Sequence, residues 1–179
     1  MPILGIMASQ ISGHLSTTSY ESIATTTVST AVSSITFSSI PATFKHLQIR
    51  GIGKPTATGA HDLLFTLNGD TTSNYFSHQL YGTGASAVSA SYGTTNQAYI
   101  TYWDNAQFGS FVCDILDYSN TNKNTTTRAL GGHDLNGSGF ILLRSGLWMN
   151  TNAVSTINLF LGSGNFAQYS QLALYGIKG

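Results

Sequence analysis

Charged side chains are scarce in this sequence. Lys and Arg together number 7 among 179 residues, as do Asp and Glu, so charged residues make up 8% of the chain, against roughly 25% in an average soluble domain. The cations form no basic run, whereas nucleic-acid affinity depends mainly on cations that neutralise phosphates. Surface helices also need Glu, Lys and Arg at their solvent positions. We therefore expect neither a nucleic-acid partner nor an all-α fold.

Cysteine and long apolar runs are also rare. The single cysteine, Cys113, excludes an intrachain disulfide, and its place in the largely apolar run 111–116 predicts a buried thiol rather than a nucleophile. Apolar runs such as residues 140–143 are far shorter than the roughly 20 residues that a membrane span requires. No basic residues precede the apolar N-terminal stretch. We expect no membrane partner and no secretory signal.

Hydroxyl, aromatic and β-branched residues are abundant instead. Ser and Thr number 22 and 23, and short β-branched and aromatic runs recur between Gly, Pro, Asn or Ser residues. Such runs predict strands, which we expect near residues 20–29, 34–38, 44–53, 62–68, 75–81, 97–104, 111–118, 125–133, 139–148, 154–161 and 168–177. No helical pattern separates them, so residues 20–179 are predicted to form one all-β domain, an antiparallel β-sandwich with a jelly roll as first choice.

Turn and loop signals divide these runs. Asn68 and Gly69 directly follow an alternating run, and both residues tolerate the positive φ of a tight turn, which we predict there. Residues 82–95, rich in Gly, Ala and Ser, and residues 119–124 are predicted to be longer loops. Loops at the ends of a sandwich are common sites of partner contacts.

The first 19 residues carry no charge and follow neither a strand nor a helical period. Their large apolar side chains favour packing on the domain itself or on a partner rather than free movement in water. We therefore predict an extended assembly arm over residues 1–19, with these contact residues: Ile3, Leu4, Ile6, Met7, Ile11 and Leu15.

Catalytic and metal-binding motifs are not evident. The histidines and acids could supply a Ser-His-Asp set, but neither a Gly-x-Ser-x-Gly nor a His-Glu-x-x-His motif selects one. Asn68, Asp70 and Asp104 could offer oxygen ligands to Ca²⁺, yet the spaced acids of a calcium loop are missing, which favours a plain turn. We predict no catalytic residue, metal or cofactor.

One of the acids near residue 115 is expected to form an ion pair with a cationic side chain or to cap the backbone. Asp114 and Asp117 lie three residues apart, and one of them, if buried, would need a cationic partner. Arg128 and Arg144 are the candidates for that partner, and a backbone cap is the other structural role open to these acids.

Carbohydrate binding is the main alternative to a purely structural role. Sugar sites stack a ring on an aromatic side chain and hold its hydroxyls with polar groups. Trp103, Trp148 and Tyr92 are the candidate glycan contacts. The position of Trp103 within a predicted strand, and that of Trp148 after an apolar run, favour the core for both.

Several segments resemble one known family. They include the N-terminal stretch 4–13, residues 20–23, the block 35–50 with its Ile-Pro turn, the segments 67–70 and 114–118, and the terminal Leu-Tyr-Gly-Ile-Lys within 172–178. Together they resemble a family of tailed-bacteriophage virion proteins over nearly the whole chain. The family supplies no catalytic motif, and the resemblance implies a structural role in the particle.

The expected function follows from this resemblance. We expect a non-enzymatic virion protein, a homo-oligomer and most commonly for such proteins a trimer, that decorates or cements the outer capsid surface through contacts with the major capsid protein. The alternative is a tail or fibre protein whose end loops bind host-surface carbohydrate.

Overall fold

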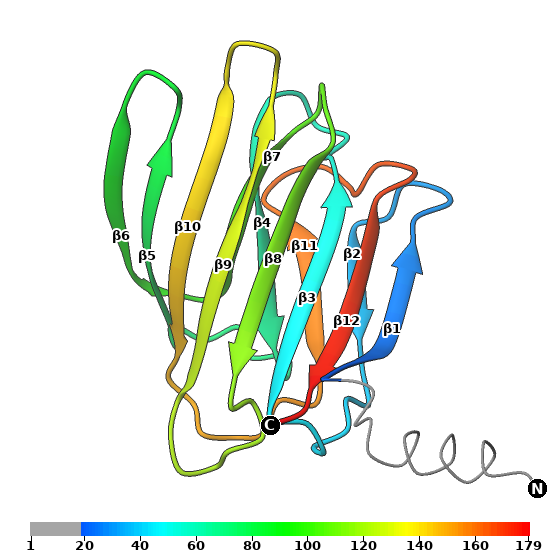
Figure 1. The fold of residues 1–179 in the computed structure, drawn as a ribbon, viewed down its shortest axis with the longest axis vertical. Helices are drawn as coiled ribbons and strands as arrows, with labels where there is room; N and C mark the ends of the chain where they lie inside the picture. Colours follow the sequence, from blue (N-terminus) through cyan, green and yellow to red (C-terminus); the bar gives the residue numbers. More distant parts are fainter. Residues whose placement is uncertain (1–18) are drawn as a thin grey trace, which may run out of the picture.

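The computed structural model describes residues 19–179, which form twelve strands and no helix (Figure 1). No helix of this part of the chain could therefore cross a membrane. The strands are β1 (Tyr20–Thr27), β2 (Ser34–Phe37), β3 (His46–Gly53), β4 (Ala60–Leu67), β5 (Tyr75–Gly82), β6 (Ala87–Thr95), β7 (Ala98–Asp104), β8 (Gly109–Leu116), β9 (Thr125–Asp134), β10 (Gly139–Trp148), β11 (Ile157–Leu161) and β12 (Gln171–Ile177).

The strands form two antiparallel sheets that pack face to face. The larger sheet has the order β1-β12-β3-β8-β9-β10-β5-β6, and the smaller has the order β2-β11-β4-β7. In Figure 1 the larger sheet lies in front and the smaller one behind it. The predicted all-β antiparallel sandwich is confirmed.

Two hairpins enlarge one sheet. The chain crosses from one sheet to the other at every step from β1 to β5, from β6 to β8 and from β10 to β12. The hairpins β5–β6 and β9–β10 interrupt this alternation, and they pair with each other through β5 and β10. We call these four strands the extension, because they carry the larger sheet beyond β8 (Figure 1).

Alternating apolar residues build the core between the sheets. Ile157, Leu159 and Leu161 of β11 point inward, as the period of two predicts, and they face Leu47 and Ile49 of β3 across a common buried cluster. Burying each such side chain contributes about 1.5–3 kcal/mol. The predicted core faces are therefore correct in both sheets.

Glycines let β7, an edge of the smaller sheet, approach the extension closely. A Cβ atom on Gly131 of β9 would lie 2.7 Å from Oγ1 of Thr101 on β7 and 2.8 Å from Cβ of Phe111. Gly53 of β3 leaves similar room for the ring of Trp103, which a Cβ atom would approach to 2.6 Å. Larger residues at these positions would push the sheets apart.

One predicted loop is wrong. Most of residues 82–95 form β6, an edge strand. The turn is confined to residues 83–86, where Thr83 N donates to Ser86 O over 3.0 Å. Ala, Ser and Gly are poor strand formers, but β6 pairs along β5, with Ala90 opposite Gln79. Tertiary pairing outweighs local propensity here.

The other turn predictions are confirmed. Asn68 and Gly69 have φ values of 52° and 70°, and Asp70 N donates to Leu67 O over 2.9 Å. This turn carries the chain from the smaller sheet into β5 of the larger one. Residues 119–124 form a loop as expected.

Candidate interaction surface

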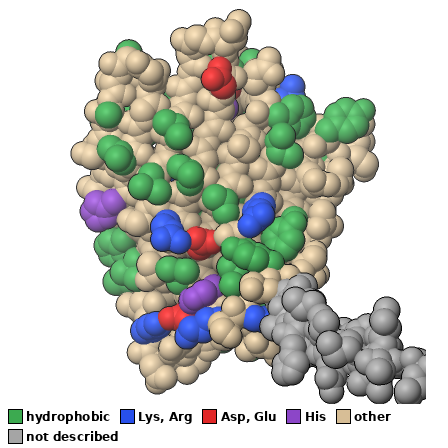
Figure 2. Space-filling model, viewed as in Figure 1, with side chains coloured by type: hydrophobic (Ala, Val, Ile, Leu, Met, Phe, Trp, Pro, Cys, Tyr) green, Lys and Arg blue, Asp and Glu red, His purple; other side chains and the backbone are tan. Residues whose placement is uncertain are grey.

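The outer face of the larger sheet carries apolar side chains that no other element of the described chain covers. In the cross-strand register, Val112 of β8 lies opposite Leu130, Leu130 opposite Leu143, and Leu143 opposite Leu80 of β5. The three leucines are 47%, 47% and 53% exposed. We call these four residues the apolar row. Figure 2 looks onto this face and shows apolar side chains above a band of charged ones.

A groove of about 650 Å³ adjoins the apolar row. Val112, Leu130 and Ile141 line it on the outer face, and Gly131 and Gly132 contribute no side chains to fill it. Ile141 is the most exposed of the aliphatic residues on this sheet, at 63%. The groove therefore offers a mainly apolar surface to a partner's side chains, with Ser110, His133 and Asp134 as its polar lining.

The charges beside the apolar row are paired with one another. Arg128 Nη2 lies 2.9 Å from Asp114 Oδ2, and Gln48 Nε2 donates to Asp114 Oδ1 over 2.7 Å. Arg50 donates to Gln48 Oε1 over 2.6 Å. The predicted pair of Asp114 with Arg128 is confirmed, so a partner that covers this pair meets two charges that already neutralise each other.

Asp117 lies in the turn after β8 and has other cationic partners. Lys45 Nζ is 2.9 Å from Asp117 Oδ1, and Lys123 also contacts the carboxylate. Hydrogen bonds from Lys123 and Lys45 lower the pKa of Asp117 to about 2. This cluster ties the 119–124 loop to the start of β3.

The second candidate partner, Arg144, is buried on the inner face of β10. Its Nη2 lies 2.9 Å from Asp62 Oδ1 on β4, and its Nε donates to Gln79 Oε1 over 2.9 Å. Burial, which outweighs the attraction of Arg144, raises the pKa of Asp62. Three tyrosine rings lie 5.1–5.9 Å from the guanidinium carbon, those of Tyr92, Tyr99 and Tyr102.

These residues form what we call the Arg144 cluster, which fastens the extension to the smaller sheet. Its members come from β4, β5, β6, β7 and β10. Burial raises the pKa of Tyr102 to about 12, so this phenol stays neutral and able to donate. Cation–π contacts of this kind stabilise a desolvated guanidinium by about 2 kcal/mol.

Two of the three candidate glycan contacts are buried, which excludes the glycan role for them and confirms the core position that the sequence favoured. Trp103 is 0% and Trp148 1% exposed, so neither ring can stack on a sugar. Trp103 packs against Phe111 and Phe166 in the core. Tyr92 is half-buried, and one face of its ring stacks on another tyrosine of the Arg144 cluster at 4.7 Å.

The polar atoms considered for calcium serve as turn caps. Asp70 accepts hydrogen bonds from Thr72, Asn74 and Nε1 of Trp148, the last over 2.7 Å. Burial raises the pKa of Asp70, but these hydrogen bonds together outweigh it and hold the pKa well below its ordinary value. Among residues 19–179, no three His, Cys, Asp or Glu side chains come together as a metal site would require.

Two sequence predictions remain, one for the cysteine and one for the N-terminal arm. Cys113 is buried as expected, and desolvation raises the pKa of its thiol far above the ordinary value. The arm residues Ile3 to Leu15 lie outside the described part of the chain.

Sequence reasoning missed the apolar row. The available signal was the unbroken apolar run 140–143: on a strand with only one covered face, every second residue of such a run points outward.

Comparisons of the chain with protein-family models, with curated protein sequences and with solved structures found no match.

Proposed function

We propose that this protein is a non-enzymatic structural component of a tailed-bacteriophage virion, which binds the outer capsid surface and stabilises the head as a decoration or cement protein. The observation that carries the proposal is the apolar row with its groove on an open sheet face. Contiguous exposed apolar side chains are typical of protein contact surfaces.

The dimensions of the larger sheet suit such a contact. Eight strands about 4.8 Å apart and about 26 Å long present a face of roughly 1,000 Å², and a specific interface needs about 800 Å² from each partner. The Asp114–Arg128 ion pair on the face is already formed, so burying this pair does not separate its two charges.

The virion assignment rests on the resemblance, and three of the resembling segments meet at one end of the sandwich. Tyr118 donates its hydroxyl to Pro41 O, and the backbone N of Phe44 lies 3.4 Å from the same hydroxyl oxygen. A side chain on Gly176 would overlap the ring of Phe44. Residues from three of the resembling segments therefore serve packing, which agrees with a family that has a structural role.

We infer that the fold is a jelly roll with two added hairpins. Without the extension hairpins, the sheets have the orders β1-β12-β3-β8 and β2-β11-β4-β7, and successive strands alternate between them except at β4 and β7. This arrangement of eight strands in two sheets supports the jelly-roll topology.

The carbohydrate-binding tail protein remains the second candidate, and the geometry favours it less. Of its three proposed contacts, Tyr92 alone keeps a partly exposed ring. We retain a homo-oligomer, a trimer by analogy with other shell proteins, as part of the first proposal.

The test is the position and copy number of the chain in virus particles. Cryo-electron microscopy of particles that contain the protein, with quantitative mass spectrometry against the major capsid protein, should find hundreds of copies over the head. A handful of copies at a single vertex would overturn the proposal in favour of the tail, and a glycan array with wild-type and Tyr92→Ala protein would then test carbohydrate binding.

A further inference from the structure

We propose that the arm of a neighbouring copy of this chain binds along the apolar row and its groove. The inference deepens the proposed function, on which it rests, by naming the occupant of the open sheet face. It follows from the chemistry of the two surfaces, from the place where the arm joins the domain, and from the charges that separate that place from the row.

The receiving surface favours an apolar ligand. The apolar row crosses four strands, a width of about 14 Å at the usual strand spacing, and the groove extends it along β9 and β10. Arg128 and Asp114, which border the row, already satisfy each other. A charged side chain placed on the row itself would lose its hydration among apolar neighbours.

The first 18 residues have this composition. They contain no Lys, Arg, Asp or Glu, and their large aliphatic side chains match the row in chemistry. Leaving so many apolar side chains in water is unfavourable, at about 25 cal/mol for each Å² exposed. The arm and the row are thus complementary surfaces within one sequence.

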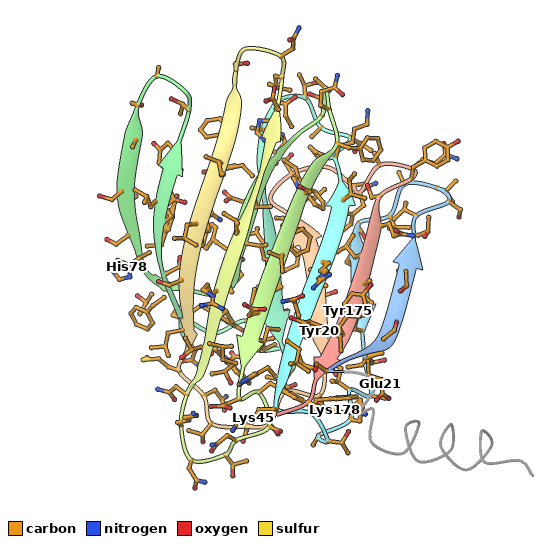
Figure 3. The ribbon with its side chains drawn as sticks, viewed as in Figure 1. Tyr20, Glu21, Lys45, His78, Tyr175 and Lys178 are labelled. Atoms are coloured by element: carbon orange, nitrogen blue, oxygen red, sulfur yellow. The ribbon has the colours of Figure 1, made fainter. Side chains whose placement is uncertain are left out.

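The arm joins the domain at the edge of the same sheet. Ser19 O accepts a hydrogen bond from the backbone N of Lys178 over 3.0 Å, and Lys178 Nζ lies 3.0 Å from Glu21 Oε2. Figure 3 shows Glu21 and Lys178 together at the lower ends of β1 and β12. Eighteen extended residues span at most about 60 Å, enough to cross from one domain to the sheet face of the next.

Charged and aromatic side chains separate this edge from the row of the same copy. Arg50 of β3 lies directly opposite Val112, and its guanidinium sits 5.2 Å from the Tyr20 ring and 5.6 Å from the Tyr175 ring. Figure 3 shows both tyrosines on this side of the sheet, with His78 at the opposite edge. An arm that followed its own sheet to the row would bury Arg50. An arm from a neighbour reaches the row without crossing it.

The test is cross-linking between two differently tagged full-length copies. One copy carries Ser9→Cys in the arm, and the other carries Ser110→Cys, which lines the groove and is exposed. Cys113 is buried and unreactive by comparison. A short bismaleimide should join the two tags when the proteins are mixed, and sedimentation should show an oligomer at the same concentration.

Two variants sharpen the test. Leu130→Ser with Leu143→Ser in the receiving copy should lower the cross-linking yield about tenfold, because two apolar contacts are removed. Val32→Ser is the matched control, since Val32 is an exposed aliphatic residue that bridges to Phe166 outside the named strands, and it should leave the yield unchanged. Circular dichroism checks that each variant is folded.

Each other outcome overturns the inference. If a copy that carries both Ser9→Cys and Ser110→Cys cross-links only within itself, the arm lies on its own domain. If the protein is monomeric and forms no cross-link, the arm contact does not exist. A yield that is insensitive to the row variant assigns the arm another site. These results are separate from the proposed function: head decoration without arm cross-linking rejects this inference alone, and arm cross-linking in a tail protein rejects the capsid assignment alone.

Discussion

Arg144 and Arg128 lie on adjacent strands of one sheet and point to its opposite faces. Each places Nη2 2.9 Å from an aspartate oxygen, but the side chain of Arg144 is 1% exposed and that of Arg128 63%. Arg144 reaches Asp62 in the other sheet, whereas Arg128 reaches Asp114 on the neighbouring strand. The same pair of groups therefore links two sheets on the inner face and neutralises a surface on the outer face.

The comparison shows how this sheet uses its two faces. A buried ion pair has to offset the cost of taking both charges out of water, which here involves Gln79 and three tyrosine rings. An exposed pair contributes about 0–1 kcal/mol. The inner face thus holds the extension in place, and the outer face stays free for contacts.

Replacing Arg144 should have the largest effect on stability. Arg144→Ala removes the partner of Asp62 and the centre of the Arg144 cluster, and should lower the free energy of unfolding by about 3–5 kcal/mol. Arg128→Ala, the matched control, should lower it by no more than about 1 kcal/mol. Urea titrations followed by circular dichroism measure both, and equal losses would contradict the distinction between the faces.

Filling the close approach of β7 to the extension should have the next largest effect. Gly131→Val places methyl groups against Thr101 and Phe111, and should destabilise the fold by about 1–3 kcal/mol. Gly93→Ala is the control, because a Cβ atom there has no neighbour within 4 Å, and the effect should stay within about 0.5 kcal/mol. Thermal unfolding distinguishes the two, and an equally mild Gly131→Val would show that the sheets tolerate a wider spacing.

Removing the cap of Trp148 should cost a similar or smaller amount. Asp70→Ala leaves the buried Nε1 of Trp148 without its acceptor, and should lower the unfolding free energy by about 1–3 kcal/mol at pH 7. The pKa of Asp70 is lower in the folded state, so its ionised form stabilises the fold fully at pH values above the ordinary aspartate pKa of 3.8. This advantage declines as the pH falls further, and the difference between variant and wild type should narrow there. Urea titrations at several pH values, read by tryptophan fluorescence, test the trend, and a constant difference would refute it.

The smallest effect is expected on the outer face. Leu143→Ser exposes less apolar surface and leaves the core intact, so its unfolding free energy should stay within about 0.5 kcal/mol of wild type. Its self-association, measured by sedimentation, should weaken. A large loss of stability in the monomer would mean that the apolar row belongs to the fold rather than to a contact surface.

Local patterns in the sequence were sufficient for most strands but not for their partners. Eleven strands were predicted near their observed positions because alternating apolar residues are a local signal. β6 was missed, since its stability comes from pairing with β5 rather than from its own residues. The partner of Arg144 was also missed: Asp62 lies 82 residues away in the chain, and only the packing of the two sheets brings them together.

The surface was the hardest part to anticipate. Sequence places Leu130 and Leu143 on strands but does not tell which face a second sheet covers. The core was easier, because the positions of Trp103 and Trp148 in the sequence favoured burial, and both are buried.

The pairing of β1 with β12 has a consequence for folding during synthesis. Tyr20 lies opposite Ile177, so the edge of the larger sheet is completed only after the ribosome has added more than 150 further residues. Contacts of such long sequence separation slow folding, and a strand that waits for its partner exposes an unpaired edge. We therefore expect newly made chains of this protein to depend on chaperones. That dependence should be greater than for proteins of similar size whose paired strands are close in sequence.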